Sequence, residues 1–273
     1  MTEDRFVFFK ARKKDDPDMT ESARNLARYM DLRDRVVFIS GGASGIGRDL
    51  VEAFAGQGSL VLFVDLNAED GRALAASSAG RARFVSCDVT DDAALNAAID
   101  QAEAMGGLDV LINNAGNDLR LAVTEVDANQ WQRLVDVNLR HQFFASQRAA
   151  KYMALRGRGS IINFGSVAPE IKVPNLAVYS ACKSAVRGLT RSLAKDLGGS
   201  GIRVNSILPG AVLTEKQRRL WYTDQASIDG MVAQQCLKRE LSGWDVAQMA
   251  LFLASDASAA CTAQDFIVDG GIL

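Results

Sequence analysis

Short apolar runs alternate with longer amphipathic segments from Val36 onward. These runs lack the alternating polar positions of a strand with one face in water, so they predict strands that are buried on both faces of a parallel sheet. The predicted strands are Arg35–Ser40, Leu60–Asp65, Ala82–Ser86, Asp109–Asn114, Ser160–Gly165, Ile202–Leu208 and Asp265–Asp269. The segments between them predict crossover helices, which makes the fold class α/β: a single domain with a doubly wound, seven-stranded parallel sheet and helices on both faces.

Two helical segments can be bounded from the pattern alone. Ser180–Leu197 carries one apolar stripe and stops at Gly198, a common signal for the end of a helix. Asn129–Arg156 is long for a crossover helix and has apolar residues on more than one face, as an interface helix would.

No linker, repeat or low-complexity tract follows residue 35, so residues 32–273 are expected to form one domain. Residues 1–31 are interpreted as an N-terminal extension with a short helix around Glu21–Tyr29. The segment 214–235 does not fit simple crossover packing and is a candidate lid over a site.

Composition excludes several classes of function. The net charge is −2 with acidic and basic residues interspersed, which argues against a nucleic acid or an anionic membrane surface as partner. The four cysteines are scattered and the chain has one histidine, so neither a zinc site nor a disulfide framework is expected. We find no apolar run long enough for a signal peptide or a membrane span, and we expect a soluble, cytoplasmic protein whose basic cluster Lys10–Lys14 is a solvated arm rather than a docking patch.

A glycine-rich turn follows the first predicted strand. Ser40–Gly47 reads SGGASGIG and opens a helix, an arrangement that lets the backbone approach a pyrophosphate at the helix N-terminus. Asp65 ends the second strand, where a carboxylate can accept hydrogen bonds from an adenosine ribose. The simpler alternatives are a structural turn and a cap for the helix after Asn67.

Tyr179 and Lys183 stand four residues apart on a predicted helix and therefore share one face. A tyrosine that accepts a proton near neutral pH needs its pKa lowered by roughly 2–3 units. The lysine and a cationic cofactor ring could lower it. Ser166 follows a strand thirteen residues upstream of Tyr179 and could hydrogen-bond a reacting oxygen.

These motifs, with NNAG at Asn113–Gly116, Asn138, YSACK at Tyr179–Lys183 and LPG at Leu208–Gly210, closely resemble the short-chain dehydrogenase/reductase family from about Arg33 to the C-terminus. The resemblance implies a Rossmann fold that binds a nicotinamide dinucleotide, and Asp65 favours NAD over NADP. The residues expected to bind the cofactor are Gly41, Ser44, Gly45, Ile46, Gly47, Asp65, Asp88, Val89, Asn114, Ala115, Gly116, Tyr179, Lys183, Pro209, Gly210, Val212 and Thr214.

The resemblance also implies four catalytic residues. Ser166 would hydrogen-bond the reacting oxygen, Tyr179 would exchange its proton, and Lys183 would hold the ribose hydroxyls and stabilise the phenolate. Asn138, through its backbone carbonyl, would position a water that links Lys183 to solvent. A serine triad does not fit because the only histidine, His141, lies upstream of Ser166. A non-catalytic dinucleotide sensor is disfavoured because all four residues are present.

Further segments resemble the aldose 1-dehydrogenases of this family, among them those for D-xylose. They are NNAGND at 113–118, VNLRH at 137–141, INFGS at 162–166, KQRRLWYT at 216–223 and QQCLK at 234–238. A sugar needs polar partners for its hydroxyls and an aromatic face for its C–H edge, so the expected substrate contacts are Asn117, Asp118, Arg120, Ser166, Tyr179, Gln217 and Trp221.

The resemblance implies oxidation of a pentose or 6-deoxyhexose to its lactone by a homotetramer. The loop Val167–Asn175 departs from the xylose enzymes, which leaves L-arabinose, L-fucose and D-galactose open as substrates. Trp221 and Tyr222 could instead only pack the lid, and a polyol or 3-oxoacyl compound is the alternative substrate.

Overall fold

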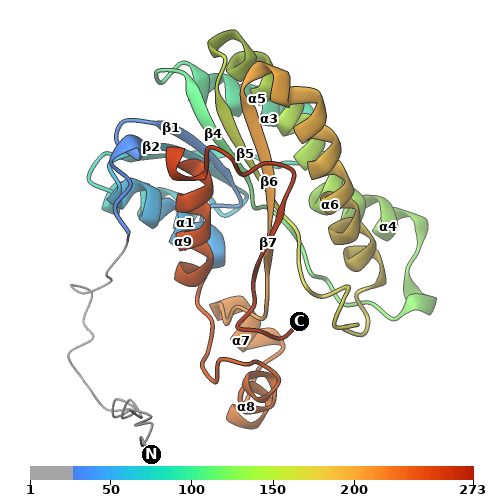
Figure 1. The fold of residues 1–273 in the computed structure, drawn as a ribbon. Coiled ribbons are helices and arrows are strands. Elements are labelled where there is room, and N and C mark those ends of the chain that lie inside the picture. The colour runs from blue at the N-terminus through green and yellow to red at the C-terminus, as the bar shows by residue number, and fades with distance from the viewer. Residues whose placement is uncertain (1–26) are drawn as a thin grey trace, which may run out of the picture.

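Seven parallel strands form one sheet in the computed structural model, which describes residues 27–273 (Figure 1). The strand order is β3-β2-β1-β4-β5-β6-β7, and the chain reverses its direction across the sheet between β1 and β4. The strands are β1 Val36–Ser40, β2 Leu60–Asp65, β3 Ala82–Ser86, β4 Leu108–Asn113, β5 Gly159–Phe164, β6 Ile202–Pro209 and β7 Asp265–Val268. Each predicted strand is confirmed within one residue at either end.

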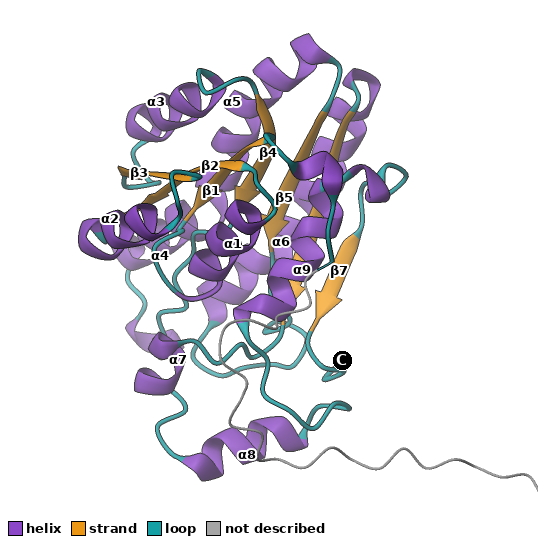
Figure 2. Ribbon diagram, turned by 90° about the vertical axis from the view of Figure 1, so that its left-hand side faces the viewer, coloured by secondary structure: helices purple, strands orange, loops and turns teal. Residues whose placement is uncertain are grey.

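Helices cover both faces of the sheet (Figure 2). The strand residues alternate between two apolar clusters: Val37 and Ile39 pack with α1, α2 and α9, whereas Val36 and Phe38 pack with α3, α5 and α6. The α-helices are α1 Gly45–Gly56, α2 Ala68–Ser77, α3 Asp92–Glu103, α4 Ala128–Val135, α5 His141–Arg156, α6 Ala177–Leu197, α7 Glu215–Leu220, α8 Gln225–Ala233 and α9 Gly243–Ala254. The short 3-10 turns are Met30–Leu32, Val123–Glu125, Gly198–Ser200 and Asp256–Ser258.

The predicted helix Asn129–Arg156 is interrupted by a π-helical turn at Asp136–Arg140, between α4 and α5. A capping box at Asp127 starts α4, and Gly157 ends α5 in the left-handed conformation with φ 66°. The extra residue of a π turn leaves no signature in the hydrophobic period, so the sequence predicted one uninterrupted helix.

The segment 214–235 contains α7 and α8, which lie beyond the carboxyl ends of the strands (Figure 1). Most of the predicted helix around Glu21–Tyr29 lies outside the described residues. Within residues 27–273, no helix is both long and apolar enough to span a membrane.

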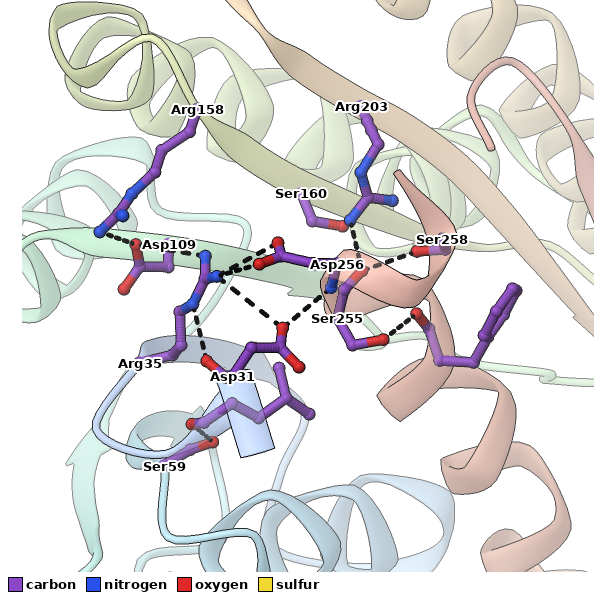
Figure 3. Close-up of polar contacts among 12 residues, drawn as sticks. Asp31, Arg35, Ser59, Asp109, Arg158, Ser160, Arg203, Ser255, Asp256 and Ser258 are labelled. Carbon is purple, nitrogen blue, oxygen red and sulfur yellow. Dashed lines mark hydrogen bonds and ion pairs between the residues drawn. The ribbon is translucent and has the colours of Figure 1, made fainter. Parts of the chain in front are cut away.

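Polar residues join the opposite, amino-terminal edge of the sheet (Figure 3). Arg35 lies 3.1 Å from Asp256 and 3.9 Å from the buried Asp109, which also pairs with Arg158 at 3.1 Å. The Asp31 backbone carbonyl accepts a hydrogen bond from Arg35 at 2.9 Å. These contacts fasten the start of β1 to the end of α9, on the edge away from the carboxyl ends of the strands.

Candidate active site

The glycine-rich turn packs directly against the loop after β4. The Asn114 side chain donates hydrogen bonds to the backbone carbonyls of Ser40 and Gly41 at 3.0 and 2.8 Å, and the Ala115 amide donates to the Ser40 hydroxyl at 3.1 Å. A Cβ added to Gly47 would lie 1.8 Å from the Gly41 carbonyl oxygen, so the turn admits only glycine there. The amide groups at the start of α1 are therefore free to meet an anion.

Asp65 fixes the other side of this turn. Its carboxylate accepts hydrogen bonds from the backbone amides of Ala43 and Asn67, both at 3.0 Å. The N-cap of α2 is Asn67, whose side chain accepts from the Asp70 amide, so capping is not the main role of Asp65. Asp65 lines a cavity of about 330 Å³. The other predicted cofactor residues on its wall are Gly41, Ser44, Ile46, Gly47, Asp88, Val89, Asn114, Ala115, Gly116 and Thr214.

A second cavity, of about 260 Å³, adjoins the first. Ser166, Tyr179 and Lys183 line it, together with the predicted nicotinamide-side residues Pro209, Gly210 and Val212. The two cavities share wall residues: Ile46, Asn114, Gly116, Thr214 and Lys216. The structure therefore provides one long cleft at the crevice where the strand order reverses, with Ser166, Tyr179 and Lys183 in its second cavity.

Tyr179 and Lys183 lie on the first two turns of α6. The ammonium nitrogen of Lys183 is 5.5 Å from the centroid of the Tyr179 ring and donates to the Phe164 carbonyl at 2.8 Å. Burial raises the pKa of Tyr179 to about 12, an effect that the Ser166 hydroxyl opposes. Burial also lowers the pKa of Lys183 to about 8. The surroundings thus favour the protonated phenol, and positive charge beside it would favour the phenolate.

Asn138 lies within the π turn and is fully buried. Its side chain accepts from the Asn117 amide at 2.9 Å and donates to the Asn117 carbonyl at 3.0 Å. The backbone carbonyl of Asn138 accepts a hydrogen bond from the Gln142 side-chain amide at 3.1 Å. The same amide donates to the Phe164 carbonyl at 3.3 Å, and Lys183 also donates to that carbonyl. That the Asn138 carbonyl positions a water for Lys183 stays a prediction.

The polar wall of the second cavity joins the loop after β4 to the lid. Asp118 accepts hydrogen bonds from Lys216 and Gln217, both at 2.7 Å. Burial raises the pKa of Asp118, but the hydrogen bonds and the charge of Lys216 outweigh burial and lower it overall. Arg120 also lines this cavity, and its guanidinium stacks 4.1 Å above the Trp221 ring. Two independent contacts thus hold α7 and the residues after it over the cleft.

The family assignment comes from comparison with known proteins. A family model described as enoyl-(acyl carrier protein) reductase matches residues 41–273. The chain is 49% identical over 251 residues to a "probable galactose dehydrogenase GalD" of Rhizobium meliloti, covering 90% of this chain and 98% of that protein. It is 40% identical over 248 residues to a D-xylose 1-dehydrogenase of Caulobacter vibrioides, with the same shares covered. The chain belongs to the short-chain dehydrogenase/reductase family.

A solved structure supports this assignment. A protein described as a short-chain dehydrogenase/reductase family protein superimposes with a TM-score of 0.79 at 34% identity, covering 89% of this chain and 98% of that chain. As a member of this family, the protein is an oxidoreductase that acts on CH–OH groups and uses a nicotinamide dinucleotide. The glycine turn, the carboxylate of Asp65 and the buried Lys183 fit such a cofactor.

The structure does not bring every predicted substrate residue of this short-chain dehydrogenase to the cavity wall. The backbone amide and carbonyl of Asn117 hydrogen-bond the Asn138 side chain, and Asn117 lines a neighbouring hollow with Leu119 and Arg133. Trp221 is absent from the wall and supports Arg120 instead, whereas Tyr222 lines the cavity.

Sequence reasoning missed Lys216 and Gln142. Lys216 stands beside Gln217 on a six-residue helix, too short to reveal its orientation. A polar residue four positions after Asn138, on the buried side of a helix, is the signal that could have found Gln142.

His141 is fully buried, and among the described residues neither of its ring nitrogens has a hydrogen-bond partner. Burial and, to a smaller extent, the nearby charge of Lys183 lower the pKa of His141 to about 3, although the backbone of Asp136 and Val137 opposes this shift. The imidazole is therefore neutral at physiological pH. A role in packing agrees with this burial, and His141 does not line the substrate cavity.

Proposed function

We propose that this protein is an NAD-dependent aldose 1-dehydrogenase, which oxidises the anomeric carbon of a pentose or 6-deoxyhexose to the aldonolactone. The observation that carries the proposal is the meeting of Ser166, Tyr179 and Lys183 with a wall of sugar-binding groups in one cavity. Asp118, Arg120 and Gln217 offer a carboxylate, a guanidinium and an amide within that cavity. The names of the two relatives above, on galactose and D-xylose, support an aldose.

In the proposed reaction, Ser166 donates a hydrogen bond to the anomeric oxygen and Tyr179 accepts its proton. NAD, when bound, would supply the hydride acceptor and, before the transfer, a positive charge near the phenol. Lys183 would hold the ribose hydroxyls and favour the phenolate, while the Ser166 hydroxyl opposes the burial that raises the pKa of Tyr179 to about 12.

The preference for NAD rests on Asp65. Its carboxylate lines the cofactor cavity at the end of β2, where it would repel the 2′-phosphate of NADP. Arg48, the nearest basic residue of this segment, is exposed and pairs with Glu52 at 3.0 Å, so it is not poised to bind that phosphate. We expect a kcat/KM for NAD at least about tenfold above that for NADP, and a loss of the preference in Asp65→Ser. Equal or better efficiency with NADP would remove Asp65 from this role.

A substrate panel tests the function itself. Purified protein is incubated with NAD and L-arabinose, D-xylose, L-fucose or D-galactose, and separately with polyols, simple secondary alcohols and 3-hydroxyacyl thioesters. Reduction of NAD is followed by absorbance, and lactone is trapped as its hydroxamate. We expect NADH and lactone in equal amounts from at least one aldose. Activity confined to the other compounds would reject the proposal in favour of the polyol or 3-oxoacyl alternative.

A further inference from the structure

The substrate cavity has two walls of opposite character. The polar wall consists of Asp118, Arg120 and Gln217, described above. The loop between β5 and α6 contributes aliphatic residues to the cavity lining, among them Ile171, Val173 and Leu176. A sugar bound beside Tyr179 would therefore meet both hydrogen-bonding groups and hydrocarbon in this cavity.

The aliphatic wall is built into the loop rather than produced by a chance rotamer. Lys172 and Asn175 have positive φ angles of 58° and 62°, a conformation that costs free energy for a residue other than glycine. The loop is held in this shape by hydrogen bonds between backbone groups. The Asn175 carbonyl accepts from the Leu121 amide at 2.9 Å, and the Val173 amide donates to the Ala168 carbonyl at 3.3 Å.

An ion pair fixes the other side of the loop. Glu170 pairs with Arg187 of α6, which also contacts Asp265 at 2.9 Å. Ile171 and Val173, the residues on either side of Lys172, line the cavity. The loop thus presents a preformed apolar surface, and ligand pockets of this kind select for shape and polarity.

Among the ring substituents of an aldopyranose, only the one on carbon 5 can be an apolar group that suits such a wall. Carbon 1 must lie at Ser166 and Tyr179, and carbons 2, 3 and 4 each carry a hydroxyl that needs a polar partner. Carbon 5 carries hydrogen in a pentose, a methyl group in a 6-deoxyhexose and a hydroxymethyl group in a hexose. We propose that Ile171, Val173 and Leu176 bind the methyl group of a 6-deoxyhexose. This inference rests on the proposed aldose 1-dehydrogenase function and narrows its substrate.

The physical chemistry gives an order of preference. A methyl group that fills a hydrophobic pocket improves kcat/KM by about tenfold or more over the analogue that lacks it. A hydroxymethyl group would instead bury a hydroxyl against hydrocarbon, where it loses its hydrogen bonds to water. The expected order of kcat/KM is therefore the methyl sugar first and the other two sugars about tenfold or more below it.

The test uses two stereochemically matched series. L-arabinose, D-fucose and D-galactose differ from one another only at carbon 5, and so do D-arabinose, L-fucose and L-galactose. We expect fucose to lead in whichever series is oxidised. If galactose equals or exceeds fucose while lactone still forms, the 6-deoxyhexose proposal is wrong and the aldose function stands. If no aldose is oxidised, both fail.

A substitution assigns the preference to the wall. Val173→Thr keeps the side-chain volume and adds a hydroxyl, which should reduce the fucose-to-galactose ratio of kcat/KM by about fivefold or more. Val123→Thr makes the same change at an exposed valine outside the cavity and should leave the ratio unchanged. Equal fucose-to-galactose ratios of kcat/KM in the two variants would show that this wall does not discriminate between the substituents on carbon 5.

Discussion

At the scale of single residues, the chemistry depends on how α6 holds Tyr179 and Lys183. Both side chains are withdrawn from water, and burial pushes their pKa values in opposite directions, to about 12 for the phenol and about 8 for the ammonium. Burial opposes ionisation of both groups, so the phenolate depends on stabilisation by Lys183 and the bound cofactor. Lys183 then contributes to cofactor binding as well as to proton transfer.

Tyr179→Phe should lower turnover by more than tenfold while leaving the binding of NAD nearly unchanged, because the ring still packs but cannot exchange a proton. Lys183→Ala should weaken both. Steady-state rates and titration of the protein with NADH distinguish the two effects. A phenylalanine variant that keeps more than about a tenth of the turnover would remove Tyr179 from its catalytic role.

The lowered pKa of the buried His141 leads to a prediction about stability. Its pKa is about 3 in the folded chain and ordinarily about 6.5, so below pH 6.5 the unfolded state binds more protons and stability falls as pH falls toward 3. Acidification from pH 7 to pH 5 should cost about 2 kcal/mol through this residue. Urea unfolding at both pH values should show that His141→Gln loses this part of the pH dependence. The same dependence in both proteins would contradict the burial of a neutral imidazole.

At the scale of elements, the sequence predicted the features that depend on local patterns of residues. The buried strands, the glycine turn after β1 and the end of α6 at Leu197 follow from local patterns, and the cleft follows from the strand order. α6 begins at Ala177, three residues before the predicted Ser180. The π turn around Asn138 and the link from Gln142 to the Phe164 carbonyl could not be predicted, because they arise from packing between α5, β5 and α6. The displacement of Trp221 behind Arg120 likewise depends on how the lid folds.

The contact between the loop after β4 and α7 should govern sugar affinity. Asp118→Asn removes the ion pair with Lys216 and should raise the KM for the sugar by about tenfold to a hundredfold with a smaller effect on kcat. Glu215→Gln removes an exposed carboxylate from the same helix and serves as the control. Equal KM values in the two variants would show that Asp118 neither holds the lid nor binds the sugar.

At the scale of the whole molecule, the two edges of the sheet have separate roles. The carboxyl edge carries the cleft, and the amino-terminal edge carries the contacts of Arg35 with Asp31, Asp109 and Asp256 (Figure 3). This separation is consistent with a strained loop at the substrate cavity. The contacts that fasten the start of β1 to α9 lie at the edge opposite the cleft.

We also propose that the chain assembles as a homotetramer. Trp131 on α4 and Phe143 and Leu155 on α5 expose 50%, 38% and 86% of their surfaces, which leaves apolar area on the helices that were expected to form an interface. Light scattering at micromolar concentration should give four times the chain mass. A monomer mass would contradict the assembly.

The most direct test of the central claim follows the hydride from the anomeric carbon. The best aldose of the panel, labelled with deuterium at carbon 1, is oxidised by the purified protein with NAD, and the reduced cofactor is analysed by mass spectrometry. The account predicts one deuterium on each reduced nicotinamide, a slower rate with the labelled sugar, and an equal amount of unlabelled lactone. Reduced cofactor without deuterium would show that the hydride comes from another carbon and would contradict the assignment as an aldose 1-dehydrogenase.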